Sequence, residues 1–256
     1  MTAATNGLVR RVSRSLADCE LMYLPRAKFD LDLAIRQHQR YTETLRQAEV
    51  QVTVLPEEPD MPDATFVEDT VVVLDELAIL CRPGVESRRL EIERIQPAIG
   101  AIRMTRCIVA PGTLEGGDVL RIGRTLYIGE SLRTNAEGIR QFEEIVTRFG
   151  YLVEIVCLHD CLHLKSAVPS PADGVLLVNP EWIDCTPLRG FELLRVPAGE
   201  PWGANTLNVN GSVLVPESVP RTADLLESCG LRVRQLDISE LQKAEAGLTC
   251  LSVLFE

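Results

Sequence analysis

Hydrophobic and polar positions follow two different periods along this chain, and each change of period marks a new element. Apolar residues three and four positions apart follow Asp30, a good N-cap residue, so the pattern predicts a helix through Ala48. Residues 50–55 alternate like a half-buried strand, and the prolines after them end regular structure. Residues 11–24 are interpreted as a strand that leads into an irregular loop.

The same order of elements then recurs along the chain. Each copy is predicted as strand, strand, helix and strand, and the copy around residues 162–178 is the weakest. The clearest signals are paired strands at 70–74 and 78–81 before a helix capped by Ser87, at 119–122 and 125–128 before a helix ended by Gly150, and at 206–209 and 212–215 around the hairpin dipeptide Asn210-Gly211.

Polar or reactive residues stand at comparable places in these copies, about 40–50 residues apart. A period of this length favours an α/β propeller, and five units around an axis would bring their anchor residues together at the centre. No linker or low-complexity stretch interrupts the series, so residues 1–256 are expected to form one domain. The anchors are Asp69, Asp118, Lys165, Asn205 and Cys250.

Composition and charge argue against several classes of function. The chain has 256 residues, of which 46% are hydrophobic and 25% charged, and its net charge of −11 disfavours nucleic acid and acidic membrane surfaces as partners. A small cationic ligand suits that charge better. The sequence contains no run of 18 apolar residues, so no membrane span is expected. Residues 1–7 lack the apolar core of a signal peptide. Eight scattered cysteines favour reduced thiols and a cytoplasmic protein.

Cys250 is the candidate nucleophile. It follows Gly247 at the start of a short apolar run, where fixed backbone could hold a thiol at a strand edge within reach of a substrate. Most free cysteines are instead small buried apolar residues, so this role requires an acid–base partner elsewhere in the chain.

Eight short motifs occur over nearly the whole chain: Pro62-Asp63, Phe66-Val67-Glu68-Asp69, Arg82-Pro83-Gly84, Ser87-Arg88-Arg89, Leu114-Glu115-Gly116-Gly117-Asp118, Arg133-Thr134-Asn135, Leu162-His163-Leu164-Lys165 and Leu248-Thr249-Cys250. In this order and spacing they resemble the dimethylarginine dimethylaminohydrolase family. The resemblance implies a five-bladed α/β propeller of ββαβ units, in agreement with the repeat. It also implies hydrolysis of Nω-methylated arginine to citrulline and a methylamine, with no cofactor and no metal.

The resemblance implies four catalytic residues. Cys250 would attack the guanidinium carbon as a thiolate, and the bound cation would help to lower its pKa. His163 would protonate the departing amine and then activate water. Glu115 and Asp69 would hold the guanidinium N–H groups as charge-assisted acceptors.

It also implies residues for the amino-acid end of the substrate. Arg88 and Arg133 would bind the carboxylate, for which a planar guanidinium is suited, although arginines at helix starts are more often simply solvated. Asp63 would take the α-amino group, and Phe66 would pack over the substrate chain.

Three further positions belong to the expected substrate-binding set. Leu21 lies in a segment that corresponds to a mobile lid, and Ala244 lies just before the nucleophile segment. Glu68 would face the substrate or serve as a structural ion-pair partner. The family usually has Asp-Gly where this chain has Glu245-Ala246, which bears on the identity of the substrate more than on the covalent chemistry.

The three histidines differ in context. His38 is expected to pack within its helix. A zinc site is an alternative for the alternating residues near His163, but residues on one face of a strand spread along a line and cannot form a tetrahedron. The four residues in question are Cys157, His159, Cys161 and His163.

Other functions stay open at this point. Asp118 is expected to brace a turn. A deiminase for free arginine or agmatine would use the same chemistry, an amidinotransferase would pass the amidino group to an amine, and a pure binding module would leave Cys250 inert. The expected partner is a small guanidino substrate, and the expected assembly is a homodimer.

Overall fold

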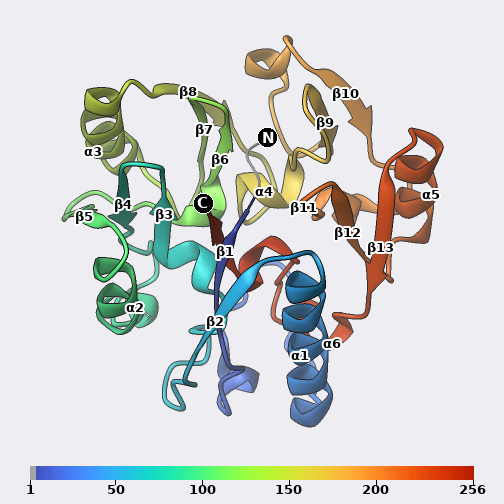
Figure 1. Cartoon of the computed structure of the whole chain (residues 1–256), viewed down its shortest axis with the longest axis horizontal. Coiled ribbons are helices and arrows are strands. Elements are labelled where there is room, and N and C mark those ends of the chain that lie inside the picture. The colour runs from blue at the N-terminus through green and yellow to red at the C-terminus, as the bar shows by residue number, and fades with distance from the viewer. Residues whose placement is uncertain (1–3) are drawn as a thin grey trace.

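The computed structural model describes residues 4–256, whose fourteen strands form five small sheets arranged in a ring (Figure 1). This is the five-bladed α/β propeller that the repeat predicted. Positions 1–3 lie outside the described residues. Two predictions include these positions: that residues 1–256 form one domain, and that residues 1–7 contain no signal peptide.

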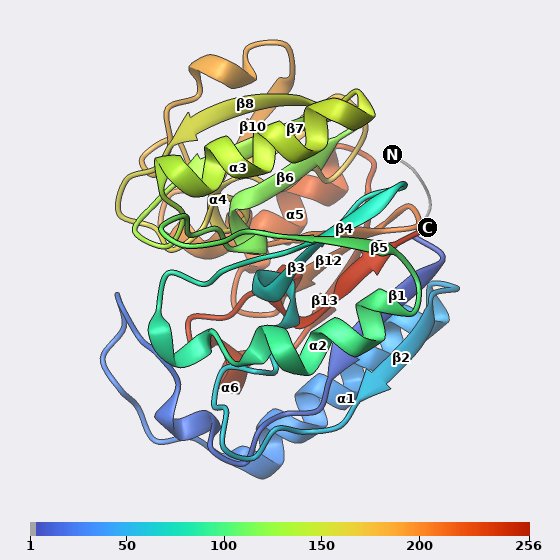
Figure 2. The same ribbon diagram turned by 90° about the vertical axis from the view of Figure 1, so that its left-hand side faces the viewer.

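Three units share the predicted ββαβ order. In each, the first two strands are antiparallel and the third runs parallel to the second, so a helix must cross over between them. Figure 2 shows α2 and α3 on the outer side of their strands. The units are β3 (Val71–Val73), β4 (Leu77–Leu80), α2 (Glu91–Gly100) and β5 (Met104–Cys107); β6 (Val119–Ile122), β7 (Thr125–Glu130), α3 (Ala136–Val146) and β8 (Leu152–Cys157); and β11 (Leu207–Val209), β12 (Ser212–Pro216), α5 (Pro220–Ser228) and β13 (Arg232–Leu236).

Both ends of the described chain build a fourth unit, which closes the ring. β1 (Asn6–Arg10) pairs antiparallel with β14 (Val253–Phe255) and parallel with β2 (Gln51–Leu55), while α1 (Leu31–Gln47) crosses over. The strand expected within residues 11–24 is therefore wrong. The apolar side chains there, such as Val12 and Leu16, are buried by loop packing, while the ladder forms just upstream.

The remaining unit departs from the repeat. It holds only β9 (Val175–Val178) and β10 (Glu192–Arg195), which are parallel; it has no inner strand, and its crossover contains a 3-10 turn, η6 (Thr186–Leu188), in place of an α-helix. The segment before β9 lies beside it, since the Leu177 amide donates to the carbonyl of Pro169 at 3.1 Å. Pro169 and Pro171 have no N–H to donate, so a regular ladder cannot form there.

The hydrophobic core is divided among five clusters, and each cluster joins two neighbouring units. One cluster, for example, packs residues of the unit that closes the ring against those of the β3–β5 unit. The ring thus lacks a single central core, and its middle is left for polar residues. The cluster that joins the ring-closing unit to the β3–β5 unit includes Leu8, Val253, Val71, Ala78 and Ile95.

Helix boundaries confirm one predicted cap and correct another. Asp30 caps α1 by accepting a hydrogen bond from the Leu33 amide, and Gly150 is left-handed (φ 79°) beyond α3, as a stop signal should be. Ser87 is not a cap, because it lies in a 3-10 turn and its hydroxyl donates to Glu20, while α2 begins at Glu91. No described helix is long and apolar enough to cross a membrane.

The alternating strand expected up to His163 is also wrong. β8 ends at Cys157, the chain turns through a left-handed Asp160 (φ 47°), and His163 precedes the short helix α4 (Leu164–Ala167). His38 is buried in α1 as expected, and burial lowers its pKa to about 4.

Candidate active site

Three of the four proposed catalytic residues lie in or next to short 3-10 turns, and His163 precedes a short α-helix. In most units a short 3-10 turn leads into the innermost strand, and three of these turns lie together. The turn η2 (Val67–Thr70) contacts both η4 (Gly116–Asp118) and η8 (Thr249–Leu251). Asp69 lies in η2, Glu115 precedes η4, Cys250 lies in η8 and His163 precedes α4, which contacts η4.

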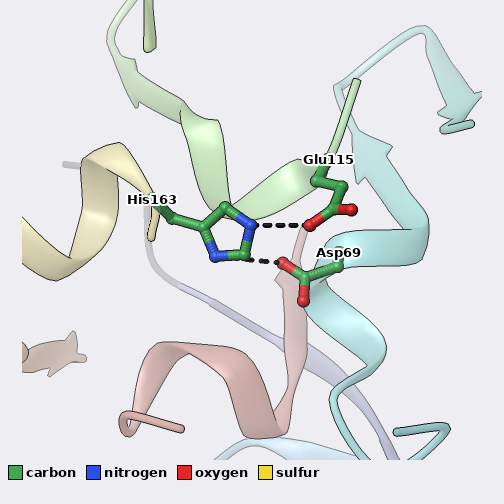
Figure 3. A group of neighbouring side chains, drawn as sticks. All are labelled: Asp69, Glu115 and His163. Atoms are coloured by element: carbon green, nitrogen blue, oxygen red, sulfur yellow. Dashed lines mark hydrogen bonds and ion pairs between the residues drawn. The ribbon is translucent and has the colours of Figure 1, made fainter. Parts of the chain in front are cut away.

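His163 is held between two buried carboxylates (Figure 3). Its Nε2 lies 2.7 Å from Oε2 of Glu115, and its Nδ1 lies 3.7 Å from Oδ1 of Asp69. Burial lowers the pKa of His163, but the charge of Asp69 and the hydrogen bond to Glu115 outweigh it and raise that pKa to about 9. The imidazole is therefore protonated at neutral pH and can act as a general acid.

The two carboxylates stay ionised beside it. Burial raises the pKa of Asp69, yet His163 and Arg88 together lower it to about 2. The pKa of Glu115 is also lowered, because its hydrogen bond to His163 outweighs burial. Glu115 further accepts the Gly84 amide at 3.0 Å. The site thus presents fixed negative charge, which a planar cation can match.

The same three side chains form the one described cluster with metal-ligand chemistry, their ligand atoms lying within 4.8 Å of one another. Here Nε2 of His163 is bonded to Glu115 and Asp69 is bonded to Arg88. A divalent ion would have to replace a proton and displace these partners. The cluster is Asp69, Glu115 and His163.

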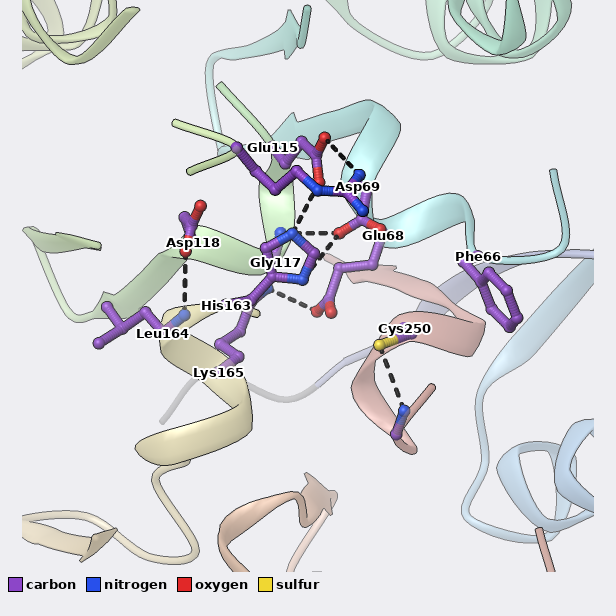
Figure 4. Close-up of polar contacts among 12 residues, drawn as sticks. Phe66, Glu68, Asp69, Glu115, Gly117, Asp118, His163, Leu164, Lys165 and Cys250 are labelled. Atoms are coloured by element: carbon purple, nitrogen blue, oxygen red, sulfur yellow. Dashed lines mark hydrogen bonds and ion pairs between the residues drawn. The ribbon is translucent and has the colours of Figure 1, made fainter. Parts of the chain in front are cut away.

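Cys250 faces the same space from η8 (Figure 4). Burial first, and then the charges of Glu68 and Asp69, raise the pKa of its thiol to about 12, and its sulfur accepts the Gly247 amide at 3.4 Å. In the substrate-free site the sulfur is therefore a neutral thiol. A cation bound against the carboxylates would reverse this effect.

Two close approaches of backbone explain the glycines around the site. A side chain at Gly247 would place its Cβ 1.8 Å from the Asn205 amide group, whose oxygen accepts the Leu248 amide and so fixes the nucleophile segment. A Cβ at Gly117 would lie 2.7 Å from both the Asp69 carboxylate and the His163 ring. Only glycine leaves room at these two positions.

Both arginines are buried near the carboxylates, but their bonding differs. Arg88 donates to Asp69 at 2.7 Å and through two nitrogens to Glu91 at 2.9 and 3.0 Å, and it also donates to the carbonyls of Asp63 and Phe66. Arg133 lies 3.4 Å from Glu115 at Nη1, and its buried Nε has no hydrogen-bond partner among the described residues. Arg133 is thus the more available of the two.

The other expected substrate-binding residues surround the nucleophile. Phe66, Ala244 and Cys250 belong to one hydrophobic cluster, and Leu21 packs against it. Asp63 accepts the Glu20 amide at 3.1 Å, which ties the lid segment to the site.

The anchors Lys165 and Asp118 have structural contacts. Glu68 forms an ion pair with Lys165 at 2.5 Å, the structural alternative left open above, while its charge also acts on Cys250. Asp118 accepts the Leu164 amide at 3.0 Å and the Ser131 hydroxyl at 2.7 Å, which braces the turn before α4 as expected.

Two contributors were not predicted. Glu91 holds Arg88 from three positions further along the chain, a helical spacing that could have indicated the pair. Glu245, noted above only as a departure from the family pattern, bonds to the lid segment some 220 positions away, a contact that no local signal predicts.

Comparison with known proteins places the chain in a family. A family model described as "N,N dimethylarginine dimethylhydrolase, eukaryotic" matches residues 26–168. The N(G),N(G)-dimethylarginine dimethylaminohydrolase of Pseudomonas aeruginosa is 37% identical over 97% of this chain and 98% of that protein. The enzyme of the same name from Streptomyces coelicolor is 38% identical over 96% and 95%.

Solved structures agree. A cysteine-to-serine mutant of the Pseudomonas aeruginosa enzyme, complexed with citrulline, superposes with a TM-score of 0.93 at 35% identity over 99% of this chain and 100% of that one. The product-bound N-terminal domain of ArgZ, an arginine dihydrolase from cyanobacteria, shares the fold at 20% identity, with a TM-score of 0.88 over 98% and 97%. The chain therefore belongs to the dimethylarginine dimethylaminohydrolase family, hydrolases of carbon–nitrogen bonds in linear amidines.

Proposed function

We propose that this enzyme hydrolyses Nω-methylated L-arginine to L-citrulline and a methylamine through a covalent intermediate on Cys250. The observation that carries the proposal is a protonated imidazole fixed between two buried carboxylates, with a thiol facing the same space. The citrulline complex of the Pseudomonas aeruginosa relative supports the same product class.

Substrate binding would use the negative charge of the site. Asp69 and Glu115 would accept N–H groups of the guanidinium, which localises a charge otherwise spread over three nitrogens and makes the central carbon more electrophilic. The cation would also offset the effect of the nearby carboxylates on Cys250, so the thiol would lose its proton only when substrate is present, and that proton would go to solvent because His163 is already protonated.

In the first half-reaction the Cys250 thiolate forms a bond to the guanidinium carbon. His163 gives its proton to the methylated nitrogen, the carbon–nitrogen bond breaks, and the neutral amine leaves. An S-alkylthiouronium on Cys250 remains. His163 can supply that proton because its pKa is about 9.

In the second half-reaction the neutral His163 takes a proton from water. The resulting hydroxide adds to the thiouronium carbon, the carbon–sulfur bond breaks, and the hydroxyl proton passes to the departing sulfur, so citrulline leaves and the neutral thiol is restored. Glu115 holds the ring at Nε2 throughout and stabilises its charged form.

The amino-acid end of the substrate would lie towards the lid segment. Arg133 would bind the carboxylate, because its buried Nε is unpartnered among the described residues. Arg88 would add charge while it stays bonded to Glu91. Asp63 would receive the α-amino group, near Leu21 and Ala244.

We further propose that residues 1–256 act as one catalytic domain that assembles as a homodimer. Each core cluster is shared by neighbouring units, so a unit cannot be removed without exposing its neighbour's core. Light scattering of the purified chain checks the assembly.

The function is tested by incubating the enzyme separately with asymmetric dimethylarginine, monomethylarginine, arginine and agmatine. Citrulline is measured for the first three and carbamoylputrescine for agmatine. The methylated substrates should turn over fastest; turnover of arginine alone would replace the proposed substrate with the deiminase alternative.

Two variants test the mechanism. Cys250→Ser should keep substrate binding and lose turnover by orders of magnitude, and unchanged turnover would exclude the thiol mechanism. His163→Gly should also be inactive, and added imidazole should restore part of the activity.

A further inference from the structure

Glu245 makes an unusual set of contacts with a distant part of the chain. Its carboxylate accepts three consecutive backbone amides: Met22 at 3.0 Å, Tyr23 at 2.5 Å and Leu24 at 2.6 Å. Its second oxygen lies 3.1 Å from the Met22 amide as well. Successive amides that converge on one oxygen form an anion-binding concavity, and here the anion is a side chain of the same protein.

The backbone at Glu245 is itself informative. Its φ is 58°, a left-handed conformation that glycine or asparagine usually adopts at the end of a helix. Glu245 occupies such an end, since its amide donates to Gln242 and the next amide donates to Leu241 just beyond α6 (Ser239–Gln242). Glu49 has the same left-handed conformation beyond α1, so what distinguishes Glu245 is the set of backbone amides that its carboxylate holds in place.

The segment that Glu245 holds buries little apolar surface and is fixed mainly by polar contacts, which include those of Arg26 with the carbonyls of Ala17 and Cys19. Met22 and Tyr23 are 40% and 38% exposed, and of this lid segment (residues 19–26) Cys19 and Leu21 pack in the adjacent core cluster. Segments with little buried apolar surface open easily, so polar contacts decide whether the lid is closed. The Tyr23 hydroxyl donates to the Cys161 carbonyl at 3.2 Å and so links the segment to another unit.

These contacts connect the lid to the candidate active site. Leu21, next to the bound amides, packs against the cluster that contains Phe66, Ala244 and Cys250. The Glu20 amide on the other side of Leu21 is held by Asp63. Fixing the amides of residues 22–24 therefore fixes the backbone at Leu21 beside the space for the substrate's amino-acid end.

We propose that Glu245 is a positioning residue that holds the lid closed and thereby sets the affinity for the α-amino-acid end of the substrate. The inference rests on the proposed function for its substrate. Catalysis itself should depend little on Glu245, because Asn205 and Gly247 hold the nucleophile segment independently. The chain's departure from the family's usual aspartate lengthens this side chain by one methylene at the point where it meets the lid.

The test uses Glu245→Gly and Glu245→Gln, with Glu200→Gln as the matched control. Glycine suits the left-handed backbone, so Glu245→Gly removes the carboxylate without risk to the fold. Glu200 is also 8% exposed and accepts two backbone amides, but those amides belong to α5. Glu200 lines the same cavity as Leu24 and Glu245, so the control removes an equivalent charge nearby without removing a hydrogen bond to residues 22–24.

Hydrogen–deuterium exchange of the free enzyme reads the lid directly. The amides of residues 22–24 should exchange about tenfold faster or more in Glu245→Gly, and by a smaller factor in Glu245→Gln, since the bonds lost are charge-assisted. KM for the methylated substrate should rise about tenfold while kcat changes less than about threefold. Glu200→Gln should alter neither quantity.

Unchanged exchange at residues 22–24 in Glu245→Gly would overturn the proposal, as would a loss of kcat at constant KM. The exchange measurement needs no substrate. It therefore stands even if the wild-type enzyme proves inactive on methylated arginines, which would instead refute the proposed function.

Discussion

Gly117→Ala tests whether the exact position of the imidazole controls turnover. Gly117 has no left-handed φ, so alanine is compatible with the backbone. The added Cβ, however, would lie 2.7 Å from Oδ1 of Asp69, 2.7 Å from Nδ1 of His163 and 2.8 Å from its Cγ. Because all three atoms belong to the proposed catalytic groups, the mutation acts on the site without changing any of its chemistry.

The size of the effect follows from these distances. Ordinary contact of a Cβ begins near 3.4 Å, so the ring and the carboxylate must each retreat by about 0.7 Å. A displacement of this order in a reacting group costs up to about 100-fold in rate, so kcat should fall roughly 10- to 100-fold. That range corresponds to about 1.4–2.7 kcal/mol of activation free energy.

Steady-state release of citrulline from asymmetric dimethylarginine measures the effect, with circular dichroism to confirm the fold. Gly100→Ala is the matched control, because a Cβ at this last residue of α2 meets nothing within 4 Å. The control should keep full activity and gain roughly 0.5–1 kcal/mol of stability. Wild-type turnover in Gly117→Ala would refute the reasoning that the ring position is fixed by this contact.

Three further predictions follow from the charges of the site. The pKa of His163 is raised above its unfolded value, so its contribution to stability is complete below about pH 6.5 and is lost as the pH passes about 9. Urea titrations across this range should show the free energy of unfolding decline by at most about 3 kcal/mol, and His163→Asn should lack this decline. Glu91→Gln should lower the free energy of unfolding by roughly 1.5–3 kcal/mol, because it weakens a buried bidentate partner of Arg88; an unchanged urea midpoint would contradict this. Alkylation of Cys250 by iodoacetamide, followed by mass spectrometry of its peptide, should accelerate beyond pH 9, since burial first and then two carboxylates raise the pKa of the thiol to about 12; a plateau near pH 7 would be inconsistent with that environment.

Local signals predicted the fold best where one short stretch decided the structure. Asp30 as a cap, Gly150 as a stop and Asn210-Gly211 as a hairpin turn depend on neighbouring residues only, and each is confirmed. Ser87 has the same local signal as a cap but lies in a 3-10 turn. The adjacent Arg88 is drawn inward to Asp69, and this tertiary contact overrides the local preference.

The spacing of the anchors predicted more of the site than any single motif did. It indicated that residues far apart in sequence meet at the centre of a ring, and the turns that carry Asp69, Asp118 and Cys250 do so. Glu115 and His163 came from the family resemblance and not from the spacing. What spacing could not give is how charges are shared. That Arg88 is bonded mainly to Glu91, whereas Arg133 keeps an unpartnered nitrogen among the described residues, depends on side-chain positions set by packing.

The pairing of β1 with β14 has a consequence for refolding. Asn6 pairs with Phe255, so this ladder closes a loop of almost the whole chain, which costs on the order of 5 kcal/mol of entropy. β14 begins three residues after the candidate nucleophile, and it is secured only when that distant partner arrives. Helical signal should therefore return before turnover when the denatured protein is diluted into buffer. A chain that has collapsed but not yet closed would hold its acid and its carboxylates while its sulfur is still unplaced.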